Sequence, residues 1–249
     1  MLYAWVDGVK RSPIAKGEST ACRDCGGALT SVIPVENVKH WRHKAGDCDP
    51  WSEPEGPWHL SWKEVFPEHC REVSLTDPAT GERHRADILC GAGTPKATVL
   101  ELQYSPISEE ERTAREAFYR QDHRMFWLIH LHDGPSSFTG WSFATSMDWE
   151  SRPVEFDGRR FAIMQWYGRS KQFIEKWKRA TAHVFFECQG RIFFLAGDSL
   201  VRRMTDGVRD FPVEDHPISR VGDHLLRSLA EQKWAILTRR VSCWQVSEP

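Results

Sequence analysis

The fold is decided by residues 99–131, which read VLELQYSPISEEERTAREAFYRQDHRMFWLIHL. Short apolar runs at 99–103 and 125–131 have the length and composition of buried strands. Between them, Ser108 precedes an acidic turn, and Glu111 lies three residues later at the spacing of a helix-capping box. The pattern predicts strand, helix (108–120) and strand, joined by a right-handed crossover that makes the strands parallel. We therefore expect an α/β protein.

Upstream of this unit, the sequence predicts one helix and two strands. Pro57 can occupy the first turn of a helix, where its missing N–H is not needed, and Pro67 would end that helix. Residues 71–75 and 83–90 are typical of strands separated by a turn. Near the start of the chain, an Asp-Gly turn signal at residues 7–8 indicates a hairpin.

Downstream, the same alternation is weaker. The expected elements are a strand at 161–165, a helix at 170–180, strands at 183–187 and 191–195, a helix near 223–232 and a strand at 234–238. No internal repeat is visible.

Composition is that of a globular protein large enough to bury a core: 249 residues, 40% hydrophobic and 27% charged. The formal net charge of -2 means that a nucleic acid would have to be held by a local patch. No apolar run approaches the roughly 18 residues of a membrane span, and no signal-peptide pattern precedes the first strands. We expect a cytoplasmic protein without a membrane partner, in which close cysteine pairs bind metal.

The first candidate site combines Asp87 with Glu101 and Gln103, each on an expected strand. Strand alternation places Glu101 and Gln103 on one face. A carboxylate and an amide buried there need a partner, and Mg²⁺ or Mn²⁺ bound by one or two carboxylates would provide it. Alternatively, Asp87 and Glu101 are the solvated faces of half-exposed strands.

A second set, Glu55, His59 and Lys63, recurs at intervals of four residues. His59 and Lys63 share one helix face, where they could contact phosphate, and Glu55 could be a further metal ligand. An ordinary polar helix face would have the same spacing.

Four basic side chains are candidates for contact with a nucleic-acid backbone: Arg42, Lys44, Arg112 and Arg115. The first two belong to a basic, aromatic segment around Trp41, which could equally be purely structural. The other two lie three apart on the expected helix, where an exposed face paired with glutamates is the alternative.

A zinc module is predicted from Cys22-x-x-Cys25 and His40-x-x-His43, which supply four ligands of the kinds that zinc prefers. Gly26-Gly27 would allow the tight turn after the second cysteine. Cys48 is a spare ligand that could replace His40. A reduced cysteine pair with unrelated histidines is the alternative.

These motifs resemble those of the competence protein CoiA-like family, within the PD-(D/E)XK nuclease superfamily. The matching segments are CRDC (22–25), HWRHKAGDCDPWSEPEGPWHLSWKEVFPE (40–68), GERHRADIL (81–89), VLELQYSPISEEERTAREAFY (99–119) and MFWLIHL (125–131). A weaker echo is WKRATAHVFFECQGRIFFL (177–195). The resemblance covers a little over half of the chain.

The resemblance implies a restriction-endonuclease-like mixed sheet flanked by helices. It implies that Asp87, Glu101 and Gln103 are catalytic, with an E-x-Q pair in place of the usual E-x-K. It also matches Glu55, His59 and Lys63 to a helix ahead of the core, and the Cys/His set to a structural zinc site.

We therefore expect a Mg²⁺- or Mn²⁺-dependent nuclease that acts on DNA in preference to RNA, in DNA processing, recombination or conflict with phage and mobile elements. The expected organisation is a zinc module at 1–50, a nuclease-like domain at 51–200 and a C-terminal extension at 201–249. Two rivals are a nucleic-acid-binding zinc protein that has lost catalysis, and an interaction module that docks through Trp58 and Trp62.

Overall fold

The computed structural model describes residues 1–46, 48–95, 97–131, 143, 147–149, 154–156, 159–167, 170–188, 191–197 and 199–204. The helix expected near 223–232 and the strand expected at 234–238 lie outside these residues. The chain divides into two compact units, Met1–Leu89 and Cys90–Pro249. The boundaries expected near residues 50 and 200 stay predictions.

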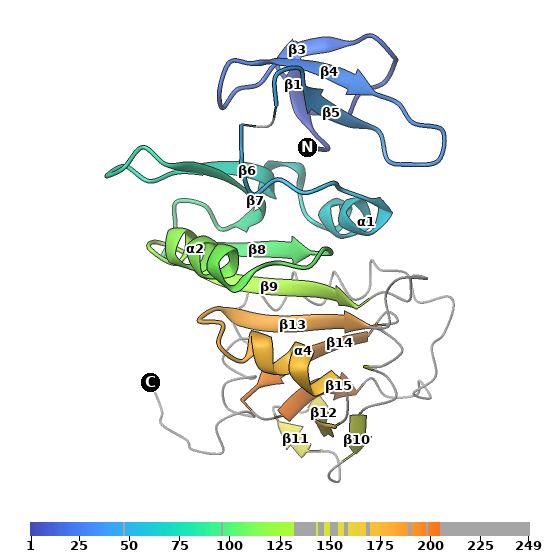
Figure 1. The fold of residues 1–249 in the computed structure, drawn as a ribbon, viewed down its shortest axis with the longest axis vertical. Helices are drawn as coiled ribbons and strands as arrows, with labels where there is room; N and C mark the ends of the chain where they lie inside the picture. Colours follow the sequence, from blue (N-terminus) through green and yellow to red (C-terminus); the bar gives the residue numbers. More distant parts are fainter. Residues whose placement is uncertain are drawn as a thin grey trace. The chain divides into compact units, whose positions relative to one another are not determined.

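The first unit begins with two small antiparallel sheets (Figure 1). β1 (Ala4–Val6) and β2 (Val9–Arg11) form the predicted hairpin, whose two turn residues both have positive φ. β3 (Ser19–Ala21), β4 (Ala28–Val32) and β5 (His40–His43) pair in that order. A small apolar core holds the sheets together, and its buried members are Ala4, Cys22, Leu29 and Trp41.

A helix and a hairpin complete the first unit. α1 (Pro57–Val65) begins at the proline as predicted, and a short 3₁₀ turn, η1 (Glu68–Cys70), follows it. β6 (Arg71–Thr76) then pairs antiparallel with β7 (Arg83–Cys90), which confirms the two predicted strands. α1, β6, β7 and the segment just before α1 supply the side chains of the ionic cluster described below.

The second unit contains the predicted β-α-β unit. β8 (Thr98–Gln103) and β9 (Arg124–Leu131) are parallel, and α2 (Glu109–Tyr119) connects them. The N–H of Glu111 donates to the Ser108 hydroxyl at 3.0 Å, so the predicted helix cap is present. All six residues of β8 are buried, as is typical of a parallel strand covered on both faces.

A second crossover and an antiparallel region extend this sheet. α4 (Ser170–Trp177) leads into β13 (His183–Cys188), which is parallel to β9. The antiparallel strands that follow in space are β14 (Arg191–Ala196), β15 (Ser199–Met204), β12 (Arg159–Trp166), β10 (Met147–Trp149) and β11 (Val154–Phe156). Strands were predicted at β12, β13 and β14, whereas β10, β11 and β15 were not, and the helix ends earlier than expected.

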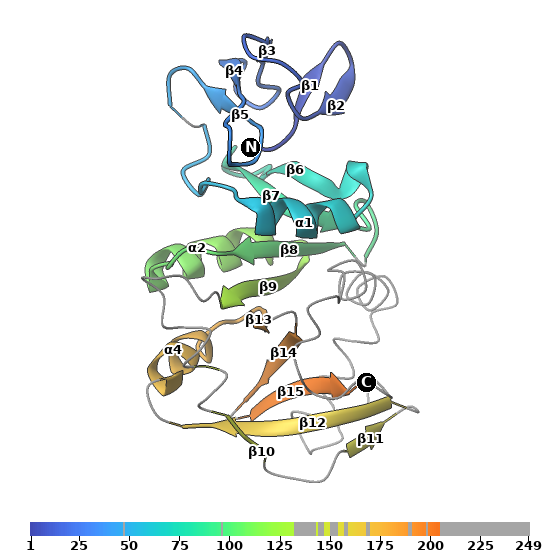
Figure 2. The ribbon, with the colours of Figure 1, turned by 90° about the vertical axis from the view of Figure 1, so that its right-hand side faces the viewer.

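Both connecting helices lie on one side of the β8–β9–β13 strands (Figures 1 and 2). They contact each other: Arg112 of α2 donates to the carbonyl of Lys176 in α4 at 3.0 Å, and Lys176 donates to the carbonyl of Ile107. The protein is thus a mixed α/β structure with a mixed sheet and few helices. The restriction-endonuclease-like identity of the fold stays a prediction.

Candidate functional site

A tight backbone loop between β3 and β4 brings Cys22 and Cys25 together. The N–H of Cys22 donates to the carbonyl of Gly27 at 2.8 Å, and the N–H of Gly26 donates to the carbonyl of Cys22 at 2.9 Å. Gly26 has a φ of 73°, which glycine adopts without a Cβ clash. The N–H of Gly27 donates to the Cys25 sulfur at 3.3 Å, and this hydrogen bond lowers the pKa of the thiol.

Four side chains converge beside this loop: Cys22, Cys25, His43 and Cys48, with ligand atoms all within 4.8 Å of one another. Cys22 Sγ lies 3.9 Å from Cys48 Sγ, and Cys25 Sγ lies 3.5 Å from His43 Nε2. Zinc–sulfur bonds of about 2.3 Å and zinc–nitrogen bonds of about 2.0 Å at tetrahedral angles separate such atoms by about 3.5–3.8 Å. The cluster could therefore bind zinc.

The prediction of His40 as a ligand is wrong, and Cys48 takes its place. His40 and His43 lie three residues apart on β5, and residues at odd spacing on a strand point to opposite faces. His43 faces the cluster on the same side as the buried Trp41, whereas His40 Nδ1 lies 3.0 Å from the carbonyl of Val38.

The electrostatics of the cluster favour a bound cation. Burial raises the pKa of Cys48 to about 12, and the neighbouring sulfurs of Cys22 and Cys25 add to this rise. A coordinated metal removes the penalty, because it binds thiolates and releases their protons. Because all four ligands would be protein groups, a zinc ion held here would be in a closed site of the structural type.

Asp24, in the β3–β4 loop, and Asp49, next to Cys48, connect the Cys/His cluster to β7. Asp49 Oδ2 accepts the N–H of Arg85 at 2.8 Å, and Oδ1 lies 3.0 Å from His84 Nδ1. Burial raises the pKa of Asp49, but these hydrogen bonds outweigh it and hold the pKa below its usual value. Asp24, between the two cysteines of the loop, lies 3.4 Å from the Arg85 guanidinium. Sequence reasoning missed these contacts, for which adjacency to Cys48 was the only signal.

A second cluster is centred on Lys63 of α1, whose side chain is buried. Its ammonium donates to Glu55, lies 3.0 Å from Glu72 Oε1 and lies 2.9 Å from Asp87 Oδ1. Three predicted site residues, Glu55, Lys63 and Asp87, thus meet at one ammonium group. The alternative of an ordinary polar helix face is wrong for Lys63.

Glu72 is the member of this cluster that sequence reasoning missed. Its carboxylate accepts the N–H of Leu2 at 2.7 Å and of Tyr3 at 3.1 Å, besides the Lys63 contact. Its φ of 45° is rare for a residue with a side chain and costs on the order of 1–3 kcal/mol. Strain of this kind persists only where surrounding contacts hold the residue. No motif marks Glu72 in the sequence.

Three carboxylates surround the Lys63 ammonium, and the N-terminal ammonium of Met1 also lies 3.8 Å from Glu55 Oε1. Burial raises the pKa of Glu55 to about 7; Lys63 opposes this rise, and Glu72 and Asp87 reinforce it. For Glu72, burial is outweighed by Lys63, so its pKa falls below the usual range. Burial lowers the pKa of Lys63, but the three carboxylates together raise it. Among the carboxylates of this cluster, Glu55 is therefore the one whose pKa is raised toward neutral pH.

His59 lies one turn before Lys63 on α1 and is also buried. Its Nε2 lies 3.1 Å from Glu53 Oε1, and the N–H of Gly56 donates to its Nδ1 at 3.4 Å. Burial lowers the pKa of His59, but the hydrogen bond with Glu53 and the charge of Asp87 outweigh burial and raise it. His59 is thus coupled electrostatically to the Lys63 cluster.

In the second unit, Glu101 and Gln103 are both buried on β8. Glu101 Oε2 lies 3.1 Å from Arg115 Nη1, and Gln103 Nε2 donates to the carbonyl of Ser105 at 2.8 Å. The alternative of a solvated, half-exposed strand face is therefore wrong for Glu101, which is 3% exposed. Asp87 belongs to the first unit, where 21% of its side chain is exposed.

Arg112 and Arg115 are not on an exposed helix face, because both are buried. The expected glutamate pairs are nevertheless present: Arg112 lies 3.7 Å from Glu109, and Arg115 lies 2.5 Å from Glu111. The guanidinium groups thus already serve contacts within the protein, and a phosphate would have to compete with these.

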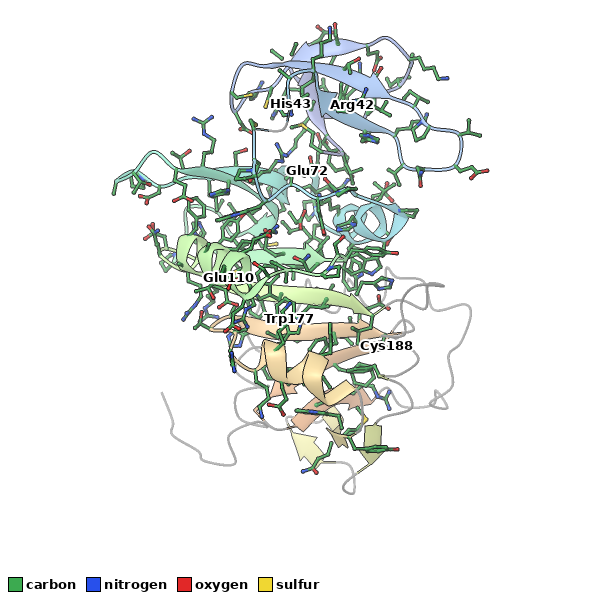
Figure 3. All side chains as sticks on the ribbon, viewed as in Figure 1. Arg42, His43, Glu72, Glu110, Trp177 and Cys188 are labelled. Carbon is green, nitrogen blue, oxygen red and sulfur yellow. The ribbon has the colours of Figure 1, made fainter. Side chains whose placement is uncertain are left out.

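Arg42 and Lys44 are exposed on and just after β5. Alternation along β5 turns Trp41 and His43 inward and Arg42 outward, and Figure 3 labels Arg42 and His43. The basic, aromatic segment therefore combines a structural inner face with a charged outer face.

Trp62 is 1% exposed, and Trp58 is half-buried with its ring edge against His59. The two tryptophans therefore do not form the continuous exposed patch that an interaction module would need.

No protein-family model, curated protein or solved structure matches the chain. Within the part of the chain that the structure describes, no helix has the length and apolar character needed to cross a membrane.

Proposed function

We propose that the protein is a metal-dependent nuclease that hydrolyses phosphodiester bonds, with DNA as the preferred substrate. The observation that carries the proposal is the meeting of Glu55, Lys63 and Asp87 in one buried cluster. Glu55 and Lys63 come from one segment that resembles the CoiA-like pattern (40–68), and Asp87 comes from another (81–89). Structural packing alone does not require a lysine and three carboxylates in a protein interior, because buried ions carry a large desolvation penalty.

The shifted pKa values of the Lys63 cluster support the same proposal. Groups with strongly shifted pKa values gather at functional sites, although structural ion pairs shift them too. The pKa of Glu55, raised to about 7 by burial, matches the range in which a general acid or base works best.

We assign Asp87 and Glu101 to a Mg²⁺ or Mn²⁺ ion, with Glu55 as an outer ligand. Such an ion, when bound, supplies an activated water and offsets the charge that develops on the phosphate. The assignment of both carboxylates to a common ion rests on the resemblance. The carboxylate chemistry of both residues fits a hard divalent cation.

The other residues act through charge and hydrogen bonds. Lys63 holds Asp87 in place and provides a permanent positive charge beside it. Glu55 accepts or returns a proton near neutral pH, and His59 would contact phosphate only by exchanging its hydrogen bond with Glu53 for one to the phosphate. Gln103 orients water or phosphate through its amide, which does not titrate.

The test is cleavage of single-stranded, double-stranded and branched DNA and of RNA by the zinc-loaded protein with Mg²⁺ or Mn²⁺. Asp87→Asn and Glu101→Gln are each expected to slow cleavage at least about a hundredfold, because metal ions contribute several kcal/mol to such reactions. The matched control is Glu110→Gln, since Glu110 is an exposed glutamate of α2. Cleavage that survives both site variants would contradict the proposal.

One rival retains an argument from the residues. Gln103 stands where the superfamily pattern has a lysine, which is what a nucleic-acid-binding protein without catalysis would show. Binding of DNA without cleavage under any of these conditions would favour this rival.

A further inference from the structure

The three-stranded sheet of β3, β4 and β5 buries one face and exposes the other (Figure 1). Leu29 of β4 and Trp41 of β5 project into the small apolar core of this sheet. Because side chains alternate along a strand, the residues on either side of these two project the opposite way. We call this second surface the outer face; it consists of Ser19 and Ala21 of β3, Ala28 and Thr30 of β4, Arg42 of β5, and Lys44, which follows β5.

Two cations stand among small side chains on the outer face. The strand register places Ser19, Thr30 and Arg42 in one row across the sheet. Lys44 lies in the next row, where its N–H donates to the carbonyl of Ala28 at 3.0 Å. Arg42 and Lys44 are both exposed, and two residues along a strand cover about 7 Å. The small neighbours leave room for an extended anion to lie across the strands and reach both cations.

Neither cation is engaged by a carboxylate of the described residues, which form no ion pair with Arg42 or Lys44. Glu18, which directly precedes β3, pairs instead with Arg11 at 3.1 Å. An anion that binds to the outer face therefore displaces no ion pair within this part of the protein.

An arginine stacked on a tryptophan lies beside β3. Trp5 of β1 is 36% exposed, and it points away from the core because its neighbour Ala4 points into the core. The guanidinium carbon of Arg23, two residues after β3, lies 3.6 Å from the centroid of the Trp5 ring. The Thr20 hydroxyl donates to the Trp5 carbonyl at 2.6 Å, which joins β1 to β3. Exposed aromatic rings and guanidinium planes are the groups on which unpaired nucleobases stack.

We propose that the outer face binds a single-stranded nucleic acid, with Arg42 and Lys44 on its phosphates and an unpaired base stacked on the Arg23–Trp5 pair. β3 and β5 are two strand spacings apart, about 10 Å, so one strand of nucleic acid can reach both parts. An acidic peptide would match the two cations but would not use the stacked pair, and a duplex keeps its bases stacked on one another. The inference takes its partner from the proposed function, but it uses none of the proposed catalytic residues.

The test is equilibrium binding of a fluorescent single-stranded DNA to the full-length, zinc-loaded protein without added Mg²⁺ or Mn²⁺. Arg42→Gln and Lys44→Gln are each expected to weaken binding roughly three- to tenfold. Each is also expected to reduce the slope of log affinity against log salt by about 0.7, the share of one phosphate contact on a single strand. Arg120→Gln is the matched control, since Arg120 is an exposed arginine outside this unit, and it should change neither quantity.

A second pair of variants tests the stacked base. Trp5→Ala is expected to weaken binding at least about fivefold without changing the salt slope, because it removes a stacking surface and no charge. Trp5→Phe keeps an aromatic ring and should restore most of the affinity, which a general loss of folding would not allow. Zinc content and the thermal unfolding of each variant are measured alongside.

Four results would overturn the inference: no binding by the unchanged protein, an unchanged salt slope in both Arg42→Gln and Lys44→Gln, unchanged affinity in Trp5→Ala, or equal affinity for the duplex of the same sequence. Displacement of the DNA by polyglutamate of matched charge would assign the outer face to an acidic protein instead. None of these outcomes depends on cleavage, so the proposed nuclease activity stands or falls separately.

Discussion

The ammonium group of Lys63 lies 2.9 Å from the carboxylate of Asp87, and this pair joins α1 to β7 within the first unit. Because 1% of the Lys63 side chain is exposed, solvent screens the interaction little. The pKa values of the surrounding carboxylates Glu55 and Glu72 are shifted in opposite directions, and such shifts make the stability of the protein depend on pH.

Glu55 is expected to make the protein less stable as pH rises from about 5 to 8. Its pKa is about 7 in the folded protein and lies near the ordinary value of 4.5 when unfolded. Between these values the folded state holds a proton that the unfolded state has released, so stability falls with rising pH. Glu55→Gln should remove on the order of 3 kcal/mol of that fall, as measured by urea unfolding at pH 5 and pH 8.

The comparison with Glu55→Gln is needed because His59 acts in the same direction. Its raised pKa contributes stability at low pH that is lost as pH rises through the folded value. In Glu55→Gln, the free energy of unfolding should therefore still fall as pH rises, but by less than in the unchanged protein. An identical decline in both proteins would show that Glu55 does not titrate in this window.

Glu101 is expected to matter for folding as well as for catalysis. Removal of its side chain takes away the ion pair with the buried Arg115 guanidinium. Breaking a buried ion pair lowers the free energy of unfolding by roughly 3 kcal/mol. Glu101→Gln retains a hydrogen-bond acceptor and should cost about 1–2 kcal/mol. Thermal and denaturant unfolding should rank Glu101→Ala below Glu101→Gln, with Glu110→Ala close to the unchanged protein. If all three variants unfold alike, the Arg115 contact contributes nothing to stability.

Zinc is expected at one ion per chain, held by Cys48 and not by His40. A structural zinc site contributes about 10–16 kcal/mol over four ligands, so Cys48→Ser should weaken binding by at least about a hundredfold. His40→Ala should leave zinc affinity unchanged, because the His40 ring hydrogen-bonds to the Val38 carbonyl and not to the cluster. Elemental analysis and competition with a chelator measure both variants. If His40→Ala weakens zinc binding and Cys48→Ser does not, the fourth ligand is His40, as the spacing predicted.

Elements with a clear period or cap could be predicted from the sequence. Ser108, Pro57 and the apolar run at 125–131 identify helices and strands through local chemistry, and the structure confirms each. The short strands β3, β10 and β11 could not be predicted in this way, because three residues are too few to show alternation. Neighbouring strands specify them instead.

The residues of the candidate site also differ in whether a local sequence pattern marks them. Cys22, Cys25 and His43 could be predicted because zinc requires particular ligands at short spacings. His40 was misassigned because an H-x-x-H spacing on a strand sends the two rings to opposite faces. Glu72 depends on contacts with residues far along the chain, and such contacts leave no local pattern.

Through the hydrogen bond from the Arg85 amide to Asp49, next to Cys48, zinc bound at the Cys/His cluster would be linked thermodynamically to the order of β7. Removal of zinc would weaken the attachment of the segment around Asp49 to β7. Hydrogen–deuterium exchange should then become faster at the amide of Arg85 than in the sheet of the second unit. Zinc availability would then control the stability of β7, the strand that carries Asp87, without zinc taking part in the reaction.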